Sequence, residues 1–107
     1  MKKLVLILSI VFLLIACGEI ENNKYKIIYH DNGSTSGFPP DDKNQYESGS
    51  LATVLGKNTL EKTGYDFGGW NTKPDYSGDY YNVGDKIKIK NINIFLHAVW
   101  NEVNLYP

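Results

Sequence analysis

The stretch GYDFGGWNT, residues 64–72, decides the fold predicted for this chain of 107 residues. Its aromatic residues are separated by small or acidic ones, a spacing typical of a β-strand, in which successive side chains point to opposite faces. We expect a strand from Tyr65 to Trp70, opened by Gly64. On this pattern Tyr65 and Phe67 should lie on the face opposite to Trp70. The surrounding chain is therefore expected to be mostly β.

Short apolar runs separated by turn residues continue on both sides of this stretch. Residues 86–90 alternate lysine and isoleucine, which predicts lysines in water, isoleucines in the core and an edge strand protected by its charge. The other predicted strands are Tyr25–His30, Leu51–Leu55 and Ile94–Trp100. In the last of these, every second residue from Ile94 to Trp100 should face the core.

Two short segments have weak helical signals. One follows Pro39-Pro40, because proline and then acidic residues suit a first helical turn, and the other is Lys57–Lys62, where a polar residue would cap. The predicted fold class is thus α+β, mostly β, with short antiparallel and mixed strands. We expect one small domain over residues 25–101, followed by a tail at residues 102–107.

The chain begins MKKLVLILSIVFLLIAC, with two lysines before a run of thirteen residues, Leu4–Ala16, that only Ser9 interrupts. As a helix this run would span roughly 20 Å, against a hydrocarbon core of roughly 30 Å, so a permanent membrane span is not expected. The pattern predicts a cleaved signal peptide at residues 1–16. It resembles bacterial lipoprotein signals, which implies lipid on Cys17 and cleavage just before it.

Cys17 is the only cysteine of the chain, so it has no partner for a disulfide within it. Lipidation explains this residue better than the alternative, an ordinary secretory signal cut after Ala16. Residues 17–24 would then be the lipidated cysteine and a short polar tether. The predicted location is the bacterial cell envelope, lipid-anchored at the outer membrane or the cell surface.

The charge of the mature part argues against nucleic acid as a partner. Without Lys2 and Lys3, nine basic residues face twelve acidic ones, a net charge of −3. Phosphate binding needs a concentrated positive surface. The membrane, reached through the lipid on Cys17, is the partner that the sequence predicts.

The stretch from Tyr25 to Trp100 resembles the internalin B-type B-repeat, also called the Listeria-Bacteroides repeat, of bacterial surface proteins. The residues that match the most specific part of its pattern are Gly64, Tyr65, Phe67, Gly69, Trp70, Leu96, Ala98 and Trp100. The resemblance implies a small β-grasp-like (ubiquitin-like) fold. Pro74-Asp75-Tyr76 departs from the usual Ala-Asp-Gly turn, and the repeat is present in a single copy rather than in an array.

No catalytic motif, phosphate-binding loop or metal-ligand spacing is visible, so we expect no enzyme, no cofactor and no metal. The only histidines, His30 and His97, lie in predicted strands. Residues 75–79 contain two aspartates that could offer oxygens to Ca²⁺, but the segment lacks the spacing and the final glutamate of an EF-hand.

Residues 70–81, WNTKPDYSGDYY, form an aromatic and polar loop that suits ligand binding, because tyrosine offers a large rigid contact area. Its possible ligand contacts are Tyr76, Tyr80, Asn71 and Asp75. The alternative is that Trp70 and Tyr81 belong to the core, which leaves Tyr76 and Tyr80 as the exposed contacts, and that Asp75 serves the turn. The predicted function is a non-catalytic, lipid-anchored envelope protein that mediates protein interaction or adhesion. Carbohydrate binding, and a structural envelope role without a specific ligand, are the alternatives.

Overall fold

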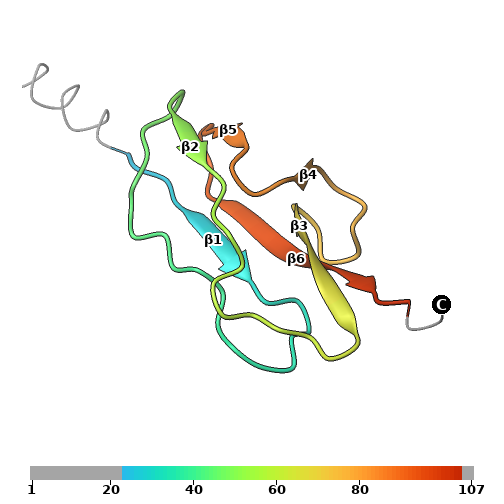
Figure 1. Cartoon of the computed structure of the whole chain (residues 1–107). Coiled ribbons are helices and arrows are strands. Elements are labelled where there is room, and N and C mark those ends of the chain that lie inside the picture. The colour runs from blue at the N-terminus through green and yellow to red at the C-terminus, as the bar shows by residue number, and fades with distance from the viewer. Residues whose placement is uncertain (1–22, 105–107) are drawn as a thin grey trace, which may run out of the picture.

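The computed structural model describes residues 23–104. The predicted signal peptide, Cys17 and the end of the predicted tail lie outside the described residues. Within the described part the elements are strands only, as Figure 1 shows. They are β1 (Ile27–His30), β2 (Leu51–Thr53), β3 (Tyr65–Asn71), β4 (Tyr80–Tyr81), β5 (Lys86–Lys88) and β6 (Ile94–Glu102).

The mostly β architecture with antiparallel and mixed strands is confirmed, but the helical part of the predicted α+β class is wrong, because residues 23–104 contain no helix. The segment 57–62 makes a single turn, in which Leu60 N donates to Lys57 O at 3.2 Å. Glu61 then pairs with Ser36 of a distant segment. Helix nucleation is costly for so few residues, so this tertiary pairing prevails. The segment after Pro40 is likewise irregular. No helix of the described part is long and apolar enough to cross a membrane.

Four strands form a mixed sheet in the order β1-β6-β3-β4, and β2 pairs with β5 in a second, two-stranded sheet. β1 runs parallel to β6, whereas β3 is antiparallel to both β6 and β4. The nine-residue β6 therefore lies at the centre of the larger sheet (Figure 1). A β-grasp also contains a helix, and residues 23–104 contain none, so the β-grasp-like expectation is not confirmed.

The core lies on one face of the larger sheet and includes residues of the second sheet. Alternate residues of β1 and β5 are buried as the sequence predicts, with Lys86 and Lys88 exposed on either side of Ile87. In β6 the predicted residues Leu96, Ala98 and Trp100 are buried, and Val99 between them is buried as well. The ring of Tyr29 packs edge to face on Trp70, with centroids 4.7 Å apart. The core side chains are Ile27, Tyr29, Ala52, Val54, Leu60, Trp70, Ile87, Ile89, Leu96, Ala98 and Trp100.

The predicted face of Trp70 is wrong. Phe67 lies opposite Trp100, and Trp70 lies opposite Ala98, so three steps along β3 match two along β6. This extra residue is a β-bulge at Gly68-Gly69, and it turns Trp70 to the same face as Phe67. Trp70 is fully buried as a result, and its Nε1 donates to Leu55 O at 2.8 Å.

Candidate functional site

The β3–β4 loop, residues 72–79, contains two of the four predicted ligand contacts, and the other two, Asn71 and Tyr80, flank it on β3 and β4. The pairs Asn71 with Tyr80 and Trp70 with Tyr81 join the two strands at its base. Thr72 closes the loop, because its N donates to Asp79 O at 3.0 Å and its Oγ1 accepts from Asp79 N at 2.8 Å. The loop is thus a hairpin connection whose two ends are hydrogen-bonded to each other.

Asn71 holds the loop from inside and is only 3% exposed. Its Oδ1 accepts from Lys73 N at 2.9 Å and from Gly78 N at 3.0 Å. Its Nδ2 donates to Tyr76 O and Gly78 O at 3.3 and 3.4 Å. With both ends of its amide used in this way, Asn71 positions the loop.

Asp75 also uses its side chain within the loop. Its Oδ1 accepts from both the backbone N and the hydroxyl of Ser77, at 3.1 and 2.6 Å. The Ser77 hydroxyl, followed by the Ser77 backbone N–H, lowers the pKa of the Asp75 carboxyl, since both hydrogen bonds favour its charged form. The predicted contact is therefore a turn-forming aspartate, of the kind that bonds its own backbone two residues on.

The Tyr76 hydroxyl accepts a hydrogen bond from Trp100 N at 2.8 Å. This N–H points to the side of β6 on which β1 pairs with residues 94–97. Because β1 ends at His30, opposite His97, it does not reach Trp100. On the same edge, the side chain of Asn32 donates to Ala98 O and to Pro74 O, both at 3.0 Å. The loop thus completes the hydrogen bonding of β6 where β1 has ended.

Tyr80 is held at the bulge. Its hydroxyl lies against Gly68 O and 3.0 Å from Asn82 Oδ1, and its single proton can go to only one of these oxygens. The rings remain accessible, since Tyr76 is 41% and Tyr80 is 49% exposed. Of the four predicted contacts, the structure leaves these two rings available, each fixed through its hydroxyl.

A second aromatic surface, on the outer face of the larger sheet, was not among the predicted contacts. His30 of β1 stacks on His97 and on Phe95 of β6, with ring centroids 5.0 and 5.9 Å apart. Burial, and then the neighbouring His30, lower the pKa of His97. Since β1 and β6 are far apart in the sequence, only their parallel pairing brings the three rings together.

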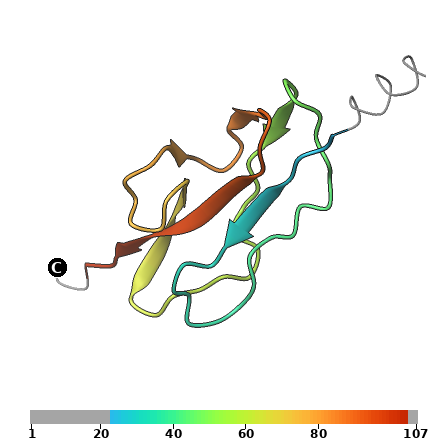
Figure 2. The same ribbon diagram turned by 180° about the vertical axis from the view of Figure 1, so that it is seen from behind.

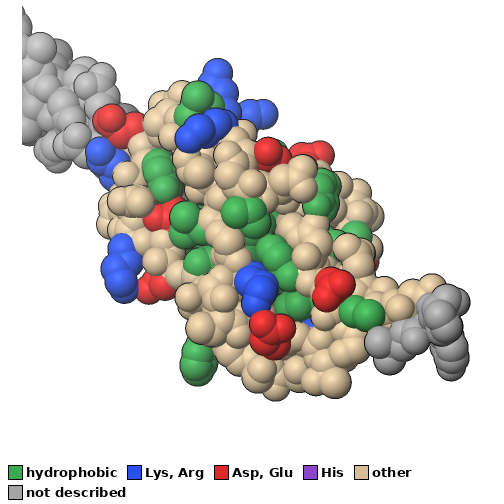
Figure 3. All heavy atoms as spheres, in the orientation of Figure 1, with side chains coloured by type: hydrophobic (Ala, Val, Ile, Leu, Met, Phe, Trp, Pro, Cys, Tyr) green, Lys and Arg blue, Asp and Glu red, His purple; other side chains and the backbone are tan. Residues whose placement is uncertain are grey.

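On the face in Figure 3, basic side chains gather at the end where β2 and β5 lie, and basic, acidic and hydrophobic side chains are interspersed over the rest. The ion pairs within the described residues are exposed, as in the 2.8 Å pair of Lys43 with Asp41. Residues 23–104 bring together no group of three or more His, Cys, Asp or Glu side chains able to hold a metal.

The model of one protein family, described as the Listeria-Bacteroides repeat domain, matches residues 25–99. Two proteins of Evansella cellulosilytica are similar to this chain. One, provisionally named a Gly-rich membrane protein, is 40% identical over 85 residues, which are 78% of this chain and 10% of that protein. The other, provisionally named a membrane protein, is 37% identical over 82 residues, or 77% of this chain and 12% of that protein. The chain therefore spans about a tenth of the length of these curated relatives. No solved structure matches the chain.

Proposed function

This chain belongs to the Listeria-Bacteroides repeat domain family, and we propose that it is a non-catalytic protein of the bacterial cell envelope whose single repeat, of the internalin B type, binds another protein. Membership of a family does not name a ligand, because one fold hosts many functions. The proposal therefore depends on the surface that the β3–β4 loop presents.

The observation that supports binding is the pair of half-exposed tyrosine rings whose hydroxyls are tied to the backbone. Tyr76 is fixed by Trp100 N and Tyr80 by the bulge at Gly68. Side chains that are already ordered lose little conformational entropy when a partner covers them. Tyrosine also combines an apolar ring with a polar tip, which suits protein surfaces. Adhesion is the form of binding that an envelope location favours.

Anchoring through lipid on Cys17 is the second part of the proposal. The relatives named as membrane proteins support an envelope location, and the signal-like start of the chain supports export. A diacylglycerol group with two acyl chains would hold the protein firmly. Only seven residues, 18–24, would separate the anchor from the repeat, so the repeat would stay close to its bilayer.

Labelling with radioactive palmitate tests the anchor. The full chain should incorporate label in bacteria, and Cys17→Ser should remove it while leaving the protein detectable with an antibody. Equal labelling of both forms would contradict lipidation at Cys17. Protease treatment of intact cells then tells whether the repeat is outside, because an exposed repeat is digested without breaking the envelope.

Site-specific photocrosslinking tests the binding surface. A photoreactive phenylalanine analogue placed at Tyr80 should give a light-dependent adduct with one defined protein in living cells. The same analogue at Phe95, which is 46% exposed on β6, serves as the matched control and should not give that adduct. An adduct with a polysaccharide would favour the carbohydrate alternative, and no adduct at position 80 would contradict a binding role for the loop.

A further inference from the structure

β1 is the edge strand of the larger sheet, and half of its backbone faces away from β6. Ile94 N donates to Lys26 O at 2.9 Å, so the backbone of Lys26 faces β6. Because backbone groups alternate sides along a strand, those of Ile28 and His30 face β6 as well. The N–H and C=O groups of Ile27 and Tyr29 therefore point outward from the sheet.

The segment of residues 38–46 lies on that outer side and runs antiparallel to β1. It pairs with the strand at one place, where Tyr25 and Tyr46 exchange two hydrogen bonds of 2.8 Å. Further along it diverges, and Asn44 N donates to Asp42 Oδ1 at 3.0 Å instead of to β1. Figures 1 and 2 both show this segment passing beside β1. Within residues 23–104, no hydrogen bond joins it to Ile27 or Tyr29.

A groove of about 340 Å³ separates the strand from this segment. Residues 26–29 form one wall and residues 38–42 the other. Ile27 is only 2% and Tyr29 only 5% exposed, so their outward backbone groups lie deep in the groove. Buried backbone donors and acceptors without a partner are rare, because they lose their hydrogen bonds to water and gain none in return.

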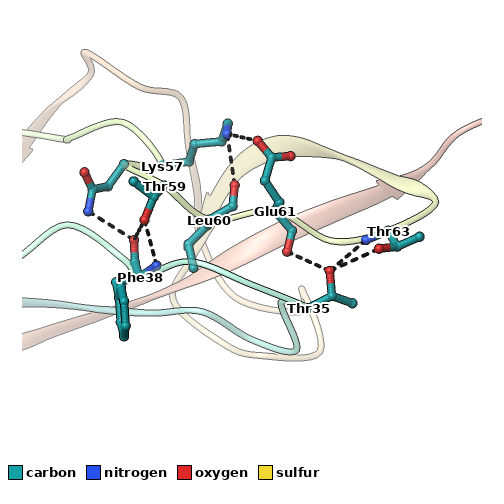
Figure 4. Close-up of polar contacts among 8 residues, drawn as sticks. Thr35, Phe38, Lys57, Thr59, Leu60, Glu61 and Thr63 are labelled. Atoms are coloured by element: carbon teal, nitrogen blue, oxygen red, sulfur yellow. Dashed lines mark hydrogen bonds and ion pairs between the residues drawn. The ribbon is translucent and has the colours of Figure 1, made fainter.

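Phe38 stands at one end of the groove on a fixed backbone. Figure 4 shows its main chain in contact with the side chain of Thr59. Its N donates to Thr59 Oγ1 at 2.9 Å, and its O accepts from Asn58 Nδ2 at 3.2 Å. The ring points away from these contacts in Figure 4 and is 75% exposed. It is a large apolar group that the described fold does not cover.

We propose that the free edge of β1 binds an extended polypeptide segment of a partner protein, which adds a strand to the sheet. The outward N–H and C=O groups of Ile27 and Tyr29 are two residues apart, the spacing at which one strand pairs with its neighbour. Sugars and lipid headgroups do not offer such alternating donors and acceptors. An apolar side chain of the peptide would pack on Phe38, and residues 39–44 would move outward to admit the backbone.

This inference rests on the proposed function, because both take the partner to be a protein. It concerns a different surface from the β3–β4 loop. Hydrogen exchange of the full chain in detergent micelles tests the free edge first. The amides of Ile27 and Tyr29 should exchange at least about tenfold faster than that of Ile28, which faces β6. Equal protection of the three amides would overturn the proposal, because the outward groups would then already have partners.

Linear peptides selected from a phage-displayed random library against the full chain are the probe for binding. The selected peptide should slow exchange at Ile27 and Tyr29 by about tenfold or more. N-methylation of every second peptide amide, on one side of the strand only, should abolish binding, whereas methylation of the intervening amides should be tolerated. If both kinds of methylated peptide lost binding, or if neither did, strand addition would be overturned.

Two phenylalanine variants separate the groove from other apolar surfaces. Phe38→Ala should weaken peptide binding about tenfold or more, and Phe95→Ala, on the outer face of the sheet, should leave it unchanged. Equal effects would overturn the assignment of Phe38. Protection that appears without peptide and vanishes on dilution would mean that a second copy occupies the edge, which also overturns the proposal. The photocrosslinking at Tyr80 is independent of these outcomes.

Discussion

The rings of Phe67 and Trp70 meet edge to face, with centroids 5.1 Å apart on one side of the sheet, although the two residues are three positions apart on β3. Only a bulge allows this contact, since alternation would place the two side chains on opposite faces. Gly69 provides the bulge with a φ of +113°, which is accessible to glycine and strained for other residues. The bulge thus places Trp70 in the core and provides the carbonyl of Gly68 that the Tyr80 hydroxyl contacts.

Replacing Gly69 by alanine should destabilise the protein strongly. A Cβ there would lie 2.6 Å from Tyr80 Oη and 2.9 Å from the backbone O of Tyr81. Tyr80 can shift its hydroxyl, but the carbonyl belongs to the hairpin itself. Backbone strain and overpacking together should lower the free energy of unfolding by about 2–4 kcal/mol. Urea denaturation followed by tryptophan fluorescence measures this change.

Gly49→Ala is the matched control for that variant. Gly49 also has a positive φ, +92°, but a Cβ there would have no neighbour within 4 Å. We expect only the cost of the backbone conformation, about 1 kcal/mol. An equal loss in the two variants would show that the contact with Tyr81 contributes nothing.

The strands of this fold could be predicted where side-chain alternation is regular, as in β1, β5 and β6. The face of Trp70 could not, because a period of two assumes an unbroken strand. The pair Gly68-Gly69 was the available signal, since glycine within a strand often marks a bulge. Residues 57–62 have a helical signal in the sequence because a capping residue acts on its immediate neighbours. The pairing of Glu61 with Ser36 joins segments far apart in the sequence, and no local pattern predicts it.

Asn71→Ala should loosen the β3–β4 loop. The substitution leaves two backbone N–H groups and two carbonyls without the partner that the buried amide provides. We expect the free energy of unfolding to fall by about 2–3 kcal/mol. Asn101→Ala, at an exposed position of β6, should change it by no more than about 0.5 kcal/mol. Urea denaturation compares the two, and a stable Asn71→Ala protein would refute the role of Asn71.

Tyr76→Phe should remove the link between the loop and β6 while keeping the ring. Without the hydroxyl, Trp100 N loses its acceptor at the part of β6 that lies beyond β1. We expect a loss of about 1–2 kcal/mol and faster hydrogen exchange at the Trp100 amide. Tyr65→Phe is the control, because the Tyr65 hydroxyl makes no hydrogen bond within the described residues. Unchanged exchange at Trp100 would mean that the bond does not form in solution.

The candidate site could be predicted from the sequence only as a region. Residues 70–81 were identified from composition, but the separation of Tyr76 and Tyr80 from Asn71 and Asp75 depends on the folded loop. A signal for Asn71 existed, since asparagine often bonds the backbone two residues on, as it does to Lys73 N. The edge of β1 had no such signal, because the order of strands in a sheet is set by non-local pairing.

The stability of the protein should fall as the pH drops from about 7.5 to about 5, owing to His97. Burial, and then His30, hold the pKa of His97 below its ordinary value of 6.5, so the unfolded chain takes up its proton first. Stability is therefore unaffected above about pH 7 and is lost as the pH falls through 6.5 towards the folded pKa. Aspartates with lowered pKa values, such as Asp75, act only at lower pH. Urea midpoints at the two pH values should differ less for His97→Gln than for the natural chain. His30→Gln should reduce the difference only in part, because burial is the larger cause. An undiminished difference in His97→Gln would assign the effect to another group.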